Sequence, residues 1–143
     1  MNDENNRKAV LLLIDYAEKH PEIKYVTRPV FHSEGADQQQ VKFLMAAGLQ
    51  GKYWDLLRFF TTYDSVDAQF LKDNAAVIDL DFTRLQNDAG SAEVRDLVRD
   101  NFHAVQKSGV TTTQSLMVGR NIYYLDGPLT LPDLEKMIGN ENR

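Results

Sequence analysis

The residues of this chain that could carry out catalysis or bind a metal include three histidines and 21 carboxylates, but no cysteine. Without cysteine there is no thiolate nucleophile, no disulfide and no thiolate ligand for zinc or an iron–sulfur cluster. The histidines are His20, His32 and His103, and they lie far apart without any metal-ligand spacing. We therefore expect no catalytic residue, no metal site and no cofactor.

Acidic residues occur at two places where they could suggest catalysis or calcium binding, but helix capping explains both. Asp3 and Glu4 precede the first helical pattern, where the helix dipole favours negative charge. Asp79 and Asp81 begin like a calcium loop, yet the sharp-turn glycine and terminal glutamate of such a loop are missing. Asp81 is instead predicted to cap a short helix.

The elements that would position these residues are mostly helices. Apolar spacing predicts a helix over residues 6–20, followed by a strand over residues 23–27 that is rich in β-forming residues. Helical spacing then continues from residue 38 to residue 108 in several pieces, with Ser65 and Ser91 as predicted N-caps and a stop at Gly109. The aromatic residues of this stretch are expected in its core, with some of them lining a groove: Tyr53, Trp54, Phe59, Phe60 and Tyr63.

The pattern changes after Gly109. Residues 114–118 and 121–125 predict a hairpin turning at Gly119-Arg120. Thr130 is predicted to cap a last helix that ends at Gly139. The order of elements indicates an α/β sandwich with a helical insertion.

Several motifs, taken in order, resemble the DsbA-like thioredoxin-fold family. They are Ile23-Lys24-Tyr25-Val26-Thr27-Arg28-Pro29 after a helix ending in His20-Pro21-Glu22, Gln50-Gly51-Lys52-Tyr53-Trp54 after a small-residue helix, Leu80-Asp81-Phe82, Ser91-Ala92-Glu93-Val94 and Ser108-Gly109-Val110. The resemblance implies an α/β, thioredoxin-like (DsbA-type) sheet with a helical subdomain inserted at about residues 36–108. It also implies a single domain spanning residues 1–143, with the first strand of the family absent.

In the family, a C-x-x-C motif opens the first helix, and a cis-proline loop faces it. The resemblance places the vestige of that motif at Asp3 to Asn6, where no residue is a thiol. Gln114 falls where the proline is expected, and we expect a trans peptide there because a non-proline cis bond costs about 2.5–4 kcal/mol. Two parts of the redox site are therefore missing.

The loop that faces the redox site in the family also pairs with an extended substrate peptide. The residues that correspond to it here are Thr111, Thr112, Thr113 and Gln114. Pairing of this kind uses backbone groups and needs no cysteine. The alternative is an ordinary connecting loop whose threonine hydroxyls bond to local backbone.

Three functions follow from the resemblance. The first is a redox-inactive DsbA-like domain that acts in binding or assembly, with an extended peptide or protein partner, or another copy of the chain pairing through an exposed sheet edge. The second is the body of a thiol–disulfide oxidoreductase whose C-x-x-C lies upstream of this chain. The third is a glutathione-linked enzyme using serine near the first helix, which is weakened because no serine precedes Ser33.

Charge and hydropathy limit the kinds of partner and the cellular compartments that we expect for this chain. A net charge of −5 argues against a nucleic-acid partner, which would require a basic face. No apolar run is long enough for membrane insertion. No signal peptide opens the chain, which predicts a cytoplasmic protein or one whose leader has been removed. The resemblance implies the bacterial periplasm.

Overall fold

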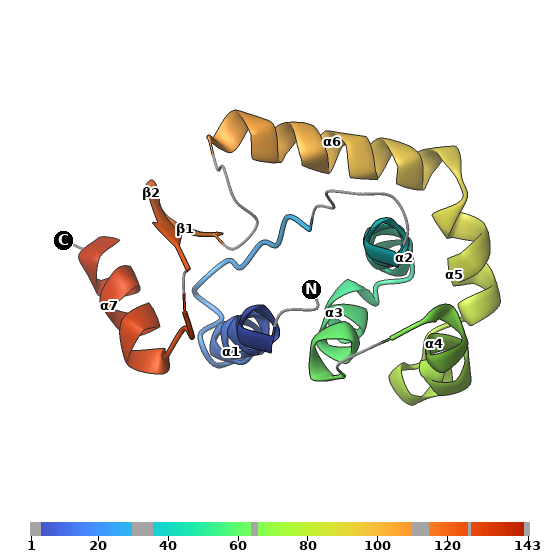
Figure 1. Cartoon of the computed structure of the whole chain (residues 1–143), viewed down its shortest axis with the longest axis horizontal. Coiled ribbons are helices and arrows are strands. Elements are labelled where there is room, and N and C mark those ends of the chain that lie inside the picture. The colour runs from blue at the N-terminus through green and yellow to red at the C-terminus, as the bar shows by residue number, and fades with distance from the viewer. Residues whose placement is uncertain (1–3, 30–35, 64–65, 110–114, 126, 142–143) are drawn as a thin grey trace.

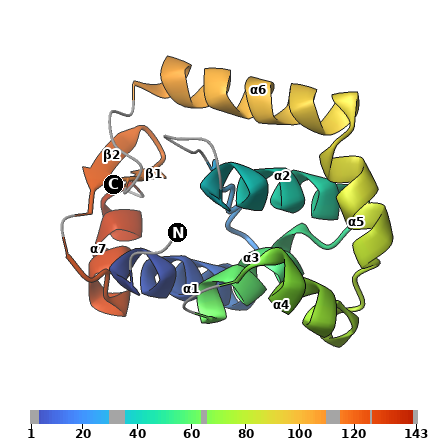
Figure 2. The same cartoon turned by 45° about the vertical axis from the view of Figure 1, so that its right-hand side comes forward.

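The computed structural model describes residues 4–29, 36–63, 66–109, 115–125 and 127–141. Within these ranges the elements are, in order, α1 (Glu4–Lys19), α2 (Ala36–Leu49), α3 (Tyr53–Thr62), α4 (Ala68–Asn74), the 3-10 helix η1 (Ala75–Ile78), α5 (Phe82–Ala89), α6 (Ala92–Ser108), β1 (Ser115–Val118), β2 (Asn121–Tyr124) and α7 (Leu131–Glu141). Figures 1 and 2 show α6 along one side of the molecule and α1 along the other, with the hairpin and α7 together at one end. The chain is thus mostly helical with a two-stranded antiparallel sheet, which is α/β only at a coarse level.

Side-chain caps set the starts of the middle helices. The side chains of Asp67, Asp81 and Ser91 each accept a hydrogen bond from the backbone N–H three residues further on, at 2.8, 3.0 and 3.2 Å. The predicted caps Asp81 and Ser91 are confirmed, and so is the stop at Gly109, which has a φ of 80°. The predicted cap Ser65 is wrong, because Asp67 occupies the N-cap position of α4.

The C-terminal elements largely follow their prediction. The strands β1 and β2 pair antiparallel from Ser115 opposite Tyr124, and Gly119 takes a φ of 61° in the turn between them. Thr130 accepts a hydrogen bond from the N–H of Asp133 at 3.3 Å and so caps α7. However, the predicted stop at Gly139 is wrong: α7 continues to Glu141, and Gly139 does not adopt the left-handed conformation that ends α6 at Gly109.

The strand predicted over residues 23–27 is wrong. Exposed and half-buried side chains do alternate along residues 24–29, as they would in a strand. Nevertheless, the described sheet consists of β1 and β2 only, and residues 24–29 belong to no ladder in it. The β-forming composition of this stretch favours extended backbone, but a strand also requires a neighbouring strand.

The hydrophobic core lies among the helices, with α2 packed against α3, α5 and α6, and α1 packed against α3. Its fully buried members are Ile14, Phe43, Leu44, Ala46, Ala47, Leu56, Leu57, Phe59, Phe60, Leu71, Ala75, Leu80, Leu85 and Val94. Each large side chain in such a core contributes about 1.5–3 kcal/mol through its burial. Among the described residues, none beyond residue 98 belongs to this cluster, and Leu134 of α7 is buried apart from it.

Candidate binding surface

The described ranges contain only part of the site predicted from the sequence. Asn6 lies in the first turn of α1, whereas Asp3 and the loop of Thr111, Thr112, Thr113 and Gln114 lie outside the described residues. The peptide-binding role of that loop and its trans peptide therefore stay predictions. The described surface lies on either side of them.

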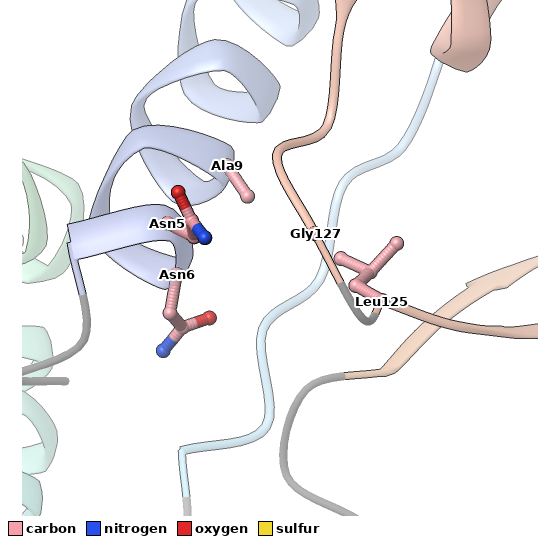
Figure 3. A pocket seen from close by; sticks show the side chains of 5 residues that line it. All are labelled: Asn5, Asn6, Ala9, Leu125 and Gly127. Atoms are coloured by element: carbon pink, nitrogen blue, oxygen red, sulfur yellow. The ribbon is translucent and has the colours of Figure 1, made fainter.

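Asn6 borders a small hollow between the start of α1 and the chain beyond the hairpin. Figure 3 shows Asn5, Asn6 and Ala9 on one side of it and Leu125 on the other, with Gly127 beside them. Its volume is about 10 Å³, the space of one water molecule. Amide side chains are neither nucleophiles nor useful acids at neutral pH, so Asn5 and Asn6 can hold a small polar group here but supply no redox or acid–base chemistry themselves.

The described histidines have local roles. His20 stacks on Tyr16 with ring centroids 4.2 Å apart, and its Nδ1 lies 3.1 Å from a carboxylate oxygen of Glu22. That contact is the second cause of the lowered pKa of Glu22, after a backbone hydrogen bond. His103 lies on α6 with its ring 6.4 Å from that of Phe102. Across the described part of the chain, no group of three or more potential ligands could hold a metal ion.

An open groove of about 620 Å³ lies between α2 and α5. The polar groups that line it are the amides of Gln38, Gln39 and Gln86 and the ammonium of Lys42. Among the described residues that line it, no carboxylate or hydroxyl lies beside Lys42 to form an acid–base pair with it.

The most unusual feature is the backbone of residues 24–28, which we call the unpaired segment. Among the described residues, none makes a backbone hydrogen bond with the N–H or C=O groups of this segment. Folded chains pair nearly all such groups unless water reaches them. The segment therefore presents strand-forming groups that are available to another chain.

Side chains hold this segment in place from its half-buried face. Tyr25 lies against Trp54 at the start of α3, with ring centroids 5.2 Å apart. The Thr27 hydroxyl is hydrogen-bonded to the phenol of Tyr53, also on α3. Because alternate residues of an extended chain point to opposite sides, Tyr25 and Thr27 anchor one face and leave the other open.

A third anchor fixes Pro29, the residue that follows the segment, to α6. The side-chain amide of Asn101 donates to the carbonyl oxygen of Pro29 at 2.6 Å, and Asn101 is only 4% exposed. Figure 1 shows the segment as a blue tube that leaves α1 and passes beneath α6. The segment is thus held to α3 along its length and to α6 at its end.

The anchoring phenols are half-buried. Burial raises the pKa of Tyr25 well above its ordinary range, with repulsion from Tyr53 as the smaller cause. Burial also raises the pKa of Tyr53, while its hydrogen bond to Thr27 and the charge of Arg28 act in the opposite direction. Both phenols stay neutral at physiological pH and act as apolar supports that also form hydrogen bonds.

The opposite face of the unpaired segment carries two exposed cationic side chains with an exposed apolar one between them. Lys24 and Arg28 are exposed on either side of Val26, which is 51% exposed. Neither cation forms an ion pair with a described residue. Trp54 is 42% exposed next to Tyr25, so an aromatic surface adjoins the segment.

The sequence pattern predicted a strand over these residues and gave no sign of a binding surface. The alternating pattern from Ile23 to Pro29 was the available signal, and it gave the correct direction of alternate side chains. The anchors could not be seen locally, since Asn101 and Pro29 are separated by 72 positions. Of the aromatic residues expected in the core, Phe59 and Phe60 are buried, whereas Trp54 and Tyr63 are exposed.

Comparison with known proteins gives no relative. The chain matches no family model, and neither the search of curated proteins nor that of solved structures finds a match. Within the described ranges, moreover, no helix combines the length and the apolar character required to cross a lipid bilayer.

Proposed function

We propose that this chain is a redox-inactive, DsbA-like thioredoxin-fold domain that binds an extended peptide or protein segment. The order of its sequence motifs resembles that family, and the absence of cysteine removes thiol chemistry from this chain. What remains to such a domain is binding through backbone and surface groups. Fold resemblance by itself assigns no function, so the proposal depends on the surface.

The observation that carries the proposal is the unpaired segment. Its backbone groups are free of partners in the described structure, and side chains on α3 and α6 hold it in position. A segment that is already ordered loses little conformational entropy when another strand joins it. Strand addition is the binding mode that uses such a segment.

A second function has support only from the resemblance: the body of a thiol–disulfide oxidoreductase completed by an upstream C-x-x-C. An insulin-reduction assay on this chain and on the protein encoded by the complete reading frame distinguishes this oxidoreductase from the binding domain. We expect no activity above buffer from either form. Activity of a longer form alone would replace the binding proposal with a truncated oxidoreductase.

Binding can be tested directly with Trp54, the single tryptophan of the chain. We expect the fluorescence emission of Trp54 to change in a saturable way when an unfolded, carboxymethylated polypeptide is added. The reason is that Trp54 contacts Tyr25 of the unpaired segment. Calorimetric titration measures the same binding independently. Absence of both signals at millimolar polypeptide would refute the proposal.

A matched pair of variants locates the binding site. Val26→Pro removes one ladder N–H without breaking any hydrogen bond in the described structure, and should abolish binding. Val26→Thr keeps the N–H and the branched shape, and should bind like the original chain. Circular dichroism of both variants checks that the helices remain. Equal binding by both variants would place the site elsewhere.

A further inference from the structure

The exposed face of the unpaired segment carries a charge pattern that can select its partner. Lys24, Val26 and Arg28 occupy alternate positions, so all three point to one side of the extended chain. The two cations have no ion-pair partner among the described residues, and the side chain between them is apolar. The pattern along this face is therefore cationic, apolar, cationic.

A strand that pairs with the segment places its side chains directly opposite these three. Opposite charges facing each other across two strands stabilise the pairing, and like charges destabilise it. The complementary strand therefore has an acidic residue, an apolar residue two positions later, and another acidic residue two positions after that. This pattern reads the same in both directions, so it fits a parallel or an antiparallel arrangement.

The same charges disfavour a second copy of this chain as the occupant. If two unpaired segments met antiparallel around Val26, each Lys24 would face an Arg28, and a parallel pairing would face identical cations. A nucleic acid or a lipid surface has no peptide backbone to pair with the N–H and C=O groups of the segment. Charge complementarity thus points to one class of occupant.

Resting on the proposed binding function, we infer that the unpaired segment recognises an extended peptide strand with the pattern acidic–x–apolar–x–acidic. Lys24 and Arg28 contact the two carboxylates, and Val26 contacts the apolar side chain between them. The intervening side chains of the peptide point toward the face that carries Trp54 and Tyr25. Backbone pairing supplies affinity, and the two cations supply selectivity.

The experiment crosses two peptides with two forms of the chain. One peptide has glutamates at the outer positions around a central valine, and the other has lysines there. We expect the original chain to prefer the acidic peptide by roughly tenfold, as two exposed cross-strand pairs of about 0.7 kcal/mol each would give. The double variant Lys24→Glu/Arg28→Glu should reverse the preference.

A control variant separates local recognition from overall charge. Lys72→Glu/Arg95→Glu changes the net charge by the same amount at exposed positions on α4 and α6. It should keep the preference for the acidic peptide. An acidic peptide that is N-methylated at alternate amides should lose binding, because those amides can no longer donate across the strands.

The outcomes distinguish this inference from the proposed function. Equal affinity for the acidic, basic and neutral peptides, still lost on N-methylation, overturns the charge selection and leaves strand binding intact. A preference that also reverses in the control variant overturns the inference, since it would follow net charge alone. Binding of no peptide overturns both the inference and the proposed function.

Discussion

Asn101 is the polar side chain that joins the middle of α6 to the end of the unpaired segment. It is almost completely buried, and its amide donates to the carbonyl of Pro29. The carbonyl of Pro29 is half-buried, and such a group keeps a cost of desolvation when it loses its donor. The stability of the chain and the position of the segment therefore depend on the same hydrogen bond.

Replacing this side chain tests that dependence. Asn101→Ala should lower the free energy of unfolding by about 1–3 kcal/mol, because the carbonyl of Pro29 is left without a donor. Urea unfolding followed by circular dichroism measures it. The matched control is Asn87→Ala on the exposed surface of α5, which should change stability by less than about 0.5 kcal/mol. A loss at Asn101 no larger than that of the control would show that the bond does not hold the segment.

The buried phenols predict a change in stability at high pH. The pKa values of Tyr25 and Tyr53 are raised by burial, so the folded chain keeps protons that the unfolded chain releases above about pH 10. The unfolded state then binds fewer protons, and the free energy of unfolding falls as pH rises beyond that value. Below it, these two groups contribute no pH dependence.

Urea unfolding at a series of alkaline pH values measures this slope. Tyr25→Phe removes one of the two late-ionising phenols, so we expect a shallower loss of stability in the variant than in the original chain. Phenolate absorbance of the folded protein provides a second measurement, with fewer than all six tyrosines ionising before the chain unfolds. An identical slope in the variant would show that Tyr25 ionises normally.

At the scale of elements, α1 and α3 are joined by an exposed ion-pair network and by a buried apolar contact. Arg58 of α3 donates to Asp15 and Glu18 of α1, each at 2.9 Å, and these bonds raise the pKa of its guanidinium, with Asp15 as the larger cause. The Arg58 side chain is 37% exposed. Exposed ion pairs of this kind contribute little to the stability of the fold. The neighbouring Leu57, in contrast, is only 2% exposed and belongs to the hydrophobic core.

The two contributions can be compared within one helix. Arg58→Met should cost less than about 1 kcal/mol, and the loss should shrink further at high salt. Leu57→Ala should cost about 2–5 kcal/mol at any salt concentration, because it leaves a cavity in the core. Thermal and urea unfolding of both variants measure the difference. A larger loss at Arg58 than at Leu57 would contradict this ranking.

The elements also show which features could be predicted from the sequence. Caps at Asp81, Ser91 and Thr130 were predictable because a short polar side chain bonds to its own helix start. Asp67 was missed because Ser65, two positions earlier, has the same capping chemistry. The strand over residues 23–27 was wrong because β propensity describes a residue, whereas a ladder requires a partner elsewhere in the chain.

For the whole molecule, the described residues divide into two unequal parts. The helices from α1 to the first half of α6 share one core, whereas the hairpin and α7 contribute nothing to it. A two-stranded hairpin without further neighbouring strands is only marginally stable by itself. The fold class was therefore predicted only coarsely, because composition and spacing do not show how many strands meet in one sheet.

This division predicts unequal protection against amide hydrogen exchange. The amides of β1 and β2 should exchange well before those of α2, where Leu44, Ala46 and Ala47 are fully buried. Exchange followed residue by residue in native conditions measures it. Equal protection in the hairpin and in α2 would show that the whole chain unfolds as one cooperative unit.

The location of the core in the first part of the sequence has a consequence for synthesis. A ribosome releases the chain from its N-terminus, and every described residue of the core cluster lies at or before residue 98. The described members of this core are thus all synthesised before the hairpin leaves the exit tunnel. We expect it to become compact during translation, with β1, β2 and α7 docking onto an already folded surface.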